Sequence, residues 1–202
     1  MFAVGHLALG YIVGKASSRI LNLRMSIPLI FVFAILPDID LLTQFLRHRG
    51  PTHSIIVVAL ISTPFLIRHR KRAIPYLLVI AQHSLIGDFL VGSVQLFWPV
   101  NMGWFGFGIP LLSLTNKILE WVFFSASLLL MVKTKDLYSL LKPHPHNLLL
   151  ILPATTTILP IAGSLMKFNI NVPVELVVPH IIYTIIFILP ILIAAILKIT
   201  NL

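Results

Sequence analysis

The chain has 202 residues, of which 58% are hydrophobic and 10% charged, and its mean hydropathy is +1.00. Soluble domains carry about 25% charged residues, so this composition excludes an ordinary soluble protein and indicates a polytopic helical membrane protein. The net charge of +9 fits contact with anionic membrane lipids, whereas no basic surface interleaved with aromatic residues indicates nucleic-acid binding.

Apolar runs long enough to cross a bilayer recur along the chain. Two shorter runs, at roughly 2–14 and 54–67, are marginal and could be tilted, half-inserted or packed against neighbouring helices. We therefore predict an all-α fold with about seven transmembrane helices, and at least five, that form a single domain over residues 1–202. The first run has no basic residue ahead of it, which is not typical of a secretory signal. The five longer runs cover roughly residues 27–46, 73–98, 113–132, 147–166 and 174–197.

The lysines and arginines indicate an orientation. With seven crossings, eleven of them fall on one side of the membrane and four on the other, and the richer side is expected to face the cytoplasm. We therefore predict that the N-terminus lies outside and the C-terminus inside. The richer side holds Lys15, Arg19, Arg24, Arg68, Arg70, Lys71, Arg72, Lys133, Lys135, Lys142 and Lys198, and the other side holds Arg47, Arg49, Lys117 and Lys167.

Acidic residues and histidines played no part in that assignment, yet they gather toward the outer face. Three tryptophans at positions 98, 104 and 121 also fit an aromatic belt there. This convergence predicts a polar site that opens to the extracytoplasmic side. The residues concerned are Asp38, Asp40, Asp88, Glu120, Glu175, His6, His48, His53, His83 and His180.

Two aspartates follow a proline in the sequence LPDID. Pro37 frees a backbone carbonyl and should kink or end the helix. In a regular helix Asp38 and Asp40 would lie about 200° apart, whereas in an extended segment they would point the same way. We favour an irregular break in which at least one aspartate binds a cation and the other binds or supports it. The alternative is a pair of helix-end carboxylates bridged to Arg47 or Arg49.

The sequence RHRGPTHS, residues 47–54, is typical of a turn. Gly50 and Pro51 should stop the preceding helix, and Thr52 should cap a helix that begins near His53. His53 would then project from the first turn of that helix toward the aspartates.

Basic side chains flank this turn. A capped helix N-terminus beside Arg47 and Arg49 would attract an anion, phosphate in particular. Alternatively, Arg47 and Arg49 anchor the chain to lipid headgroups. His48 is either an additional ligand or a solvated loop residue.

A second pair of polar residues lies in the sequence QHSLIGDFLVG, residues 82–92. His83 and Asp88 are five positions apart, about 140° around a regular helix, so they share a face only if Gly87 marks a bulge or a break. His6, between two glycines near the start of the chain, adds a further imidazole.

The chain contains no cysteine, so a metal would be held by His, Asp or Glu. These ligands suit Zn²⁺, Mn²⁺ or Mg²⁺, and imidazole favours zinc. A catalytic metal lowers the pKa of bound water to about 7, and neighbouring arginines would hold a phosphoryl group. The combination fits hydrolysis of a phosphoester in a lipid headgroup.

Five segments, in this order, resemble the YdjM-like family of membrane-bound metal-dependent hydrolases: GHLALG (5–10), LPDID (36–40), HRGPTHS (48–54), QHSLIGD (82–88) and VQLFWP (94–99). The resemblance covers roughly residues 1–100, while 101–202 are predicted to be supporting transmembrane helices. The family is considered distantly similar to zinc-dependent phospholipase C and P1 nuclease, in which His and Asp from several helices hold a zinc cluster. In the family the later His and Asp are usually four apart, whereas here they are five apart. The resemblance implies a metal site made of His6, Asp38, Asp40, His53, His83 and Asp88, with His48 and Arg49 close by.

We therefore predict a membrane-embedded phosphoesterase that acts on lipid or lipid-linked phosphate, with Asp40, His53 and Arg49 in catalytic roles. Glu120 and His180 either close the site from later helices or make structural hydrogen bonds. The alternatives are a divalent-cation transporter or channel that uses the same residues for binding, and a non-catalytic subunit of a membrane complex.

Overall fold

The computed structural model describes residues 1–43, 45–165 and 172–200. All regular elements in these ranges are helical, and the β contact within them is one isolated bridge between Val94 and Phe105. The α-helices are α1 (Ala3–Ile20), α2 (Ile27–Ile35), α3 (Ile55–His69), α4 (Ile74–Gln82), α5 (Leu114–Lys133), α6 (Asp136–Leu140), α7 (Ile151–Leu165) and α8 (Val174–Thr200). Five tighter or wider helical turns join them: η1 (Leu36–Leu42), η2 (Pro51–His53), η3 (Arg70–Ala73), η4 (His83–Asp88) and η5 (Pro145–Leu150).

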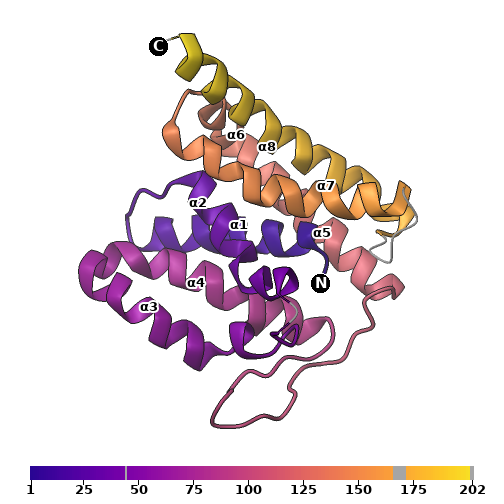
Figure 1. Ribbon diagram of the computed structural model, residues 1–202. Helices are drawn as coiled ribbons and strands as arrows, with labels where there is room; N and C mark the ends of the chain where they lie inside the picture. The colour runs from indigo at the N-terminus through magenta and orange to yellow at the C-terminus, as the bar shows by residue number, and fades with distance from the viewer. Residues whose placement is uncertain (44, 166–171, 201–202) are drawn as a thin grey trace.

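Helix α1 is the centre of the fold. It packs against α2, α4 and α5, while α7 and α8 pack against each other. Figure 1 shows α3 and α4 on one side of α1 and α2, with α7 and α8 on the other side. The buried face of α1 carries Leu7 and Tyr11, and Phe31 of α2 stacks on Tyr11. The resulting apolar core positions the polar N-terminal part of α1 beside the ends of α2 and α4.

Three helical segments are long and apolar enough to cross a membrane: Leu114–Lys133, Pro145–Gly163 and Val174–Ile196. The all-helical prediction is confirmed, but the predicted count of five to seven spans is not supported. The apolar runs at 27–46 and 73–98 are not continuous α-helices, because α2 ends at Ile35 and α4 at Gln82. The nine residues of α2 cover about 14 Å, roughly half of a bilayer's hydrocarbon core. Beyond Gln82 the helix that begins with α4 continues through the wider turn η4 to Leu90.

Helices α1 and α5 run in the same direction and define two ends of the bundle. At one end, the backbone N–H of Phe2 donates to Glu120 Oε1 in the second turn of α5, at 2.6 Å. At the other end, Asp136 accepts a hydrogen bond from the Tyr11 hydroxyl, and Lys15 Nζ lies 2.8 Å from Asp136 Oδ2. We call the first of these the α5-start end, because α5 begins there.

Close packing of α1 on α2 depends on Gly10, because a Cβ atom at that position would clash with the Ala34 side chain. We expect Gly10→Val to destabilise the protein by about 1–3 kcal/mol through overpacking. The melting temperature of the detergent-purified protein measures this. Ala16→Val places the same side chain at an exposed position of the same helix and is the control. Equal melting temperatures for the two variants would contradict this account of the packing.

Candidate metal centre

His83 and Asp88 reach the same point because the chain between them is not α-helical. Residues His83–Asp88 form a turn of π-helix, which is wider than an α-helix and places residues five apart on one side. The bulge predicted near Gly87 is therefore confirmed, and it accommodates the five-residue spacing. Both His83 and Asp88 are buried.

Two further irregular turns supply the remaining polar residues. After α2 the chain tightens into the 3-10 helix η1, in which Asp38 and Asp40 both turn toward η2. His53 lies in the 3-10 turn η2 rather than in an α-helix, and the predicted cap at Thr52 is wrong. Ser54 caps α3 instead, because its hydroxyl accepts hydrogen bonds from the backbone N–H groups of Ile56 and Val57.

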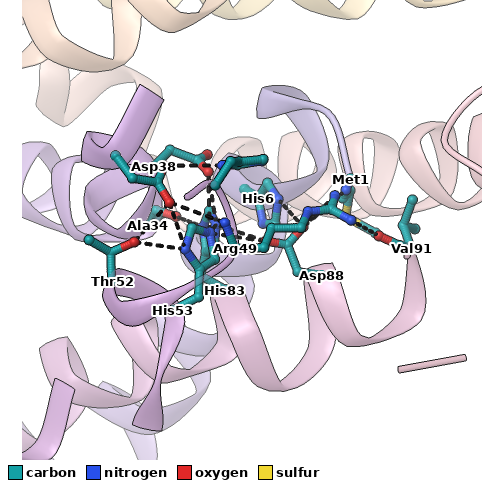
Figure 2. Close-up of polar contacts among 12 residues, drawn as sticks. Met1, His6, Ala34, Asp38, Arg49, Thr52, His53, His83, Asp88 and Val91 are labelled. Carbon is teal, nitrogen blue, oxygen red and sulfur yellow. Dashed lines mark hydrogen bonds and ion pairs between the residues drawn. The ribbon is translucent and has the colours of Figure 1, made fainter. Parts of the chain in front are cut away.

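Four side chains from these three turns converge on one point, as Figure 2 shows. The Nε2 atoms of His53 and His83 are 3.2 Å apart. Asp38 Oδ1 lies 3.4 Å from His53 Nε2 and 3.3 Å from His83 Nε2. Asp88 Oδ2 lies 3.1 Å and 3.4 Å from the same two atoms. We call these four residues the metal cluster, because their ligand atoms could hold one ion.

The separations can be compared with what a metal requires. A tetrahedral zinc ion with ligand distances of about 2.0–2.1 Å holds its donors about 3.3–3.4 Å from one another. The five separations that involve an imidazole nitrogen are 3.1–3.4 Å and agree with that value, and all four donor atoms lie within 4.8 Å of one another. The donor set of two imidazoles and two carboxylates also fits zinc, with Mn²⁺ as the harder alternative. The geometry and the chemistry of the cluster therefore both fit a divalent cation.

The outer nitrogens of the two imidazoles are held by groups outside the cluster. His83 Nδ1 lies 2.7 Å from the backbone carbonyl oxygen of Ala34, to which an N–H there would donate. His53 Nδ1 lies 3.3 Å from Asp40 Oδ2 and 3.0 Å from Thr52 Oγ1. Hydrogen bonds of this kind fix the imidazole tautomer and leave Nε2 free to bind a metal. The structure thus places Asp40, predicted as a ligand, on the far side of His53 from the cluster centre.

Asp40 is held in place by several donors and influences His53 electrostatically. Burial alone would raise the pKa of Asp40, but hydrogen bonds from His48, His53 and Thr52 outweigh it and keep the pKa well below its usual value. Burial alone would lower the pKa of His53, but hydrogen bonds to Asp38, Asp40 and Asp88 raise it to about 10. The carboxylates therefore create a strong preference for positive charge at His53, which a proton and a metal cation would compete to satisfy.

His6 and His48 lie next to the cluster but outside the set of four. His6 stacks on His83 with ring centroids 3.7 Å apart, and its Nε2 is 3.4 Å from Asp88 Oδ1. Gly87 permits this position, because a Cβ atom there would clash with the His6 ring. His48 contacts Asp40 at 3.0 Å and is exposed to solvent. With Asp40 and His53 it forms a second group that could hold an ion.

Arg49 was predicted to bind an anion, but its guanidinium group is already engaged. One terminal nitrogen lies 2.8 Å from Asp88 Oδ1, and the other donates to the Val91 carbonyl oxygen at 2.7 Å (Figure 2). Gly92, with φ of +97°, lies directly against the guanidinium, and a side chain there would clash with it. The geometry thus makes Arg49 a residue that holds Asp88 in position. Neither Val91 nor Gly92 carried a sequence signal for this role.

Glu120 and His180 lie outside the metal cluster. Glu120 accepts the hydrogen bond from Phe2 described above, and His180 Nδ1 is 2.8 Å from the carbonyl oxygen of Leu176, one turn earlier in α8. Both side chains are buried. The sequence left open whether these two residues close the site or make structural hydrogen bonds. Their contacts support structural hydrogen bonding.

The fold and the cluster together define a class: a helical membrane protein with buried His and Asp side chains that could hold a metal ion. The sequence matches the YdjM inner membrane protein family over residues 1–170, and the chain belongs to that family. Comparison with the curated proteins and with the solved structures gave no significant match.

The two aspartates of LPDID differ in position, and this difference is testable by metal analysis. We expect Asp38→Asn to reduce bound metal below detection, because it removes a donor. We expect Asp40→Asn to weaken metal affinity only about 10–100-fold, because Asp40 acts through His53. Titration of the detergent-purified, metal-free proteins with zinc would measure both. His180→Gln, a change at a buried imidazole outside the cluster, should leave binding intact. Equal losses in the two aspartate variants would contradict the assignment.

The two arginines of the RHR sequence provide a second matched pair. Arg49→Ala removes the groups that hold Asp88, so we expect zinc affinity to fall about 10–100-fold. Arg47→Ala removes an arginine that stacks on Trp104 at 4.5 Å, and it should leave zinc affinity unchanged. A larger loss of affinity from Arg47→Ala than from Arg49→Ala would show that charge near the site matters more than the contact with Asp88.

Proposed function

We propose that this protein is a metal-dependent membrane hydrolase that cleaves phosphoester bonds in lipids or lipid-linked phosphates. The observation that carries the proposal is the metal cluster, in which two imidazoles and two carboxylates meet at separations suited to one divalent ion. Asp38 has an exposed fraction of 18%, whereas the other three side chains are at 0–1%. The Asp38 edge is therefore the side from which a substrate would approach.

In this proposal the residues of the cluster have separate tasks. His53, His83, Asp38 and Asp88 would hold the ion, most favourably Zn²⁺, with Mn²⁺ or Mg²⁺ as alternatives. Once bound, the ion would supply Lewis acidity for attack on a phosphoester at neutral pH.

The surrounding residues would preserve that geometry. Asp40 would keep His53 in the tautomer that presents Nε2 to the ion, and Arg49 would keep Asp88 turned inward. Because Arg49 already contacts Asp88 and Val91, its proposed task is to position a ligand rather than to hold the phosphoryl group.

The proposed orientation follows from the charges at the two ends of the bundle. The cluster lies toward the α5-start end, because His6 in the first turn of α1 contacts Asp88. Lys15 lies at the opposite end of the bundle, together with Lys133 and Lys135 near the end of α5. Since positively charged loops favour the cytoplasmic side, that end would face the cytoplasm and the cluster would face outside.

One observation favours a second candidate function. The cluster offers four protein donors to one ion. Structural zinc sites have four protein ligands, whereas catalytic sites keep a position open for water or substrate. Under this alternative, the ion would stabilise the fold and the protein would catalyse no reaction. A catalytic role requires that one donor, with Asp38 at the exposed edge the best placed, give way to water or substrate.

The test is an assay of zinc-loaded protein in mixed micelles. The substrates would be a diacyl phospholipid, a phosphatidic acid and a polyisoprenyl diphosphate, with release of water-soluble phosphate compounds as the readout. We expect turnover of at least one of them, with loss in Asp38→Asn and retention in His180→Gln. Stoichiometric zinc with no turnover, and a large fall in melting temperature on chelation, would favour the structural site. Zinc flux in proteoliposomes without turnover would favour transport.

A further inference from the structure

Large apolar side chains project into solvent directly beside the metal cluster. Between the ligands Asp38 and His53, the chain exposes Leu42 to 81% and Phe45 to 98% of their full surface. The loop between η4 and α5 exposes Phe107 to 73%. Large exposed apolar side chains that gather beside a polar site point to an interaction surface. We call this surface the apolar rim, defined by Ile39, Leu42, Phe45, Met102, Phe107 and Leu112.

The two segments of the rim are joined by direct contacts. The guanidinium of Arg47 lies over the ring of Trp104, 4.5 Å from its centroid. The backbone N–H of Gln95 donates to the carbonyl oxygen of Arg49 at 2.9 Å. Residues 36–43 and 45–48 and the loop before α5 therefore belong to one surface beside the cluster.

The loop segment of the rim leads into a candidate membrane span. In Figure 1 the long loop after α4 leads directly into α5, and α5 is a candidate span from its first residue, Leu114. In the first turns of α5 and α8, Lys117 Nζ and Glu175 Oε1 form an ion pair at 2.8 Å, and Trp121 donates to the Glu175 carbonyl oxygen. Charged and tryptophan side chains in this position are typical of the membrane interface.

We propose that the apolar rim docks into the interfacial region of the lipid bilayer. The rim is continuous with a membrane-spanning helix, which fixes it next to lipid, and its apolar groups are flanked by the cationic Arg47 and the aromatic Trp104. Arg and Trp favour the headgroup level, while Phe and Leu enter the acyl boundary. A consequence, which rests on the proposed function, is that lipid reaches the exposed Asp38 edge from within the membrane plane.

The test uses single-tryptophan variants reconstituted in phosphatidylcholine vesicles. In a background of Trp98→Phe, Trp104→Phe and Trp121→Phe, one tryptophan is introduced by Phe45→Trp. Ile118→Trp, at an exposed position of α5, is the control for lipid contact, and Lys71→Trp, in the basic turn η3, is the control for water. Phe107→Trp probes the second segment of the rim if Phe45→Trp does not fold.

Docking predicts that brominated phosphatidylcholine quenches most of the tryptophan fluorescence of Phe45→Trp. Bromine atoms near the headgroups should quench it more strongly than bromine atoms deep in the acyl chains. Acrylamide in the aqueous phase should quench it only weakly. Acrylamide quenching equal to that of Lys71→Trp, with no effect of bromine, would overturn the proposal. Shielding from both quenchers, together with crosslinked dimers, would overturn it in favour of a second copy of the chain as the occupant. The readout needs neither metal nor turnover, so its result is independent of the hydrolase assay.

Discussion

The structure depends on placing one buried and one partly buried carboxylate beside two buried imidazoles without leaving their charges uncompensated. Ionised carboxylates are costly to bury, whether in a protein core or in a membrane, unless positive charge lies close to them. Arg49 and the N-terminal ammonium group of Met1 both supply positive charge to Asp88, and the remaining demand falls on the imidazoles or on a cation. The rest of the N-terminal half serves this requirement, because the ends of α1, α2 and α4 meet at the cluster and the apolar core behind them holds them there.

Departures from regular α-helix are the means by which the chain builds the cluster. Each of the four residues lies in a 3-10 or π turn, and these turns lie at the end of α2, before α3 and at the end of α4. A regular helix presents residues three or four apart on one face and cannot bring residues five apart to one point. The turn η1 ends α2, whereas η4 widens the helix that α4 begins and that continues to Leu90.

The sequence predicted the residue types of the site better than their individual positions. Asp38, His53, His83 and Asp88 could be selected because polar residues are rare in so apolar a chain, and the bulge at Gly87 followed from the five-residue spacing. The separation of Asp38 from Asp40 could not be predicted, because it depends on the register of η1. Nor could the engagement of Arg49, which depends on a backbone carbonyl and on the conformation of Gly92. The structure does not support the predicted number of spans, because hydropathy reports the composition of a run and not whether one regular helix continues through it.

The unequal exposure of the four cluster residues has a consequence for how an ion would be acquired. Three of them are sealed from solvent, and Asp38 alone among the four has measurable access. Entry and escape of a cation would therefore pass the Asp38 carboxylate and the turn η1 that carries it. We expect the rate of exchange to follow the opening of η1, whereas the equilibrium affinity follows the donor set. A chelator in free solution would then remove the ion slowly, even if it binds the ion far more tightly than the protein does. The metal content of a sample would therefore depend on which ions the protein met earlier as well as on the ions around it.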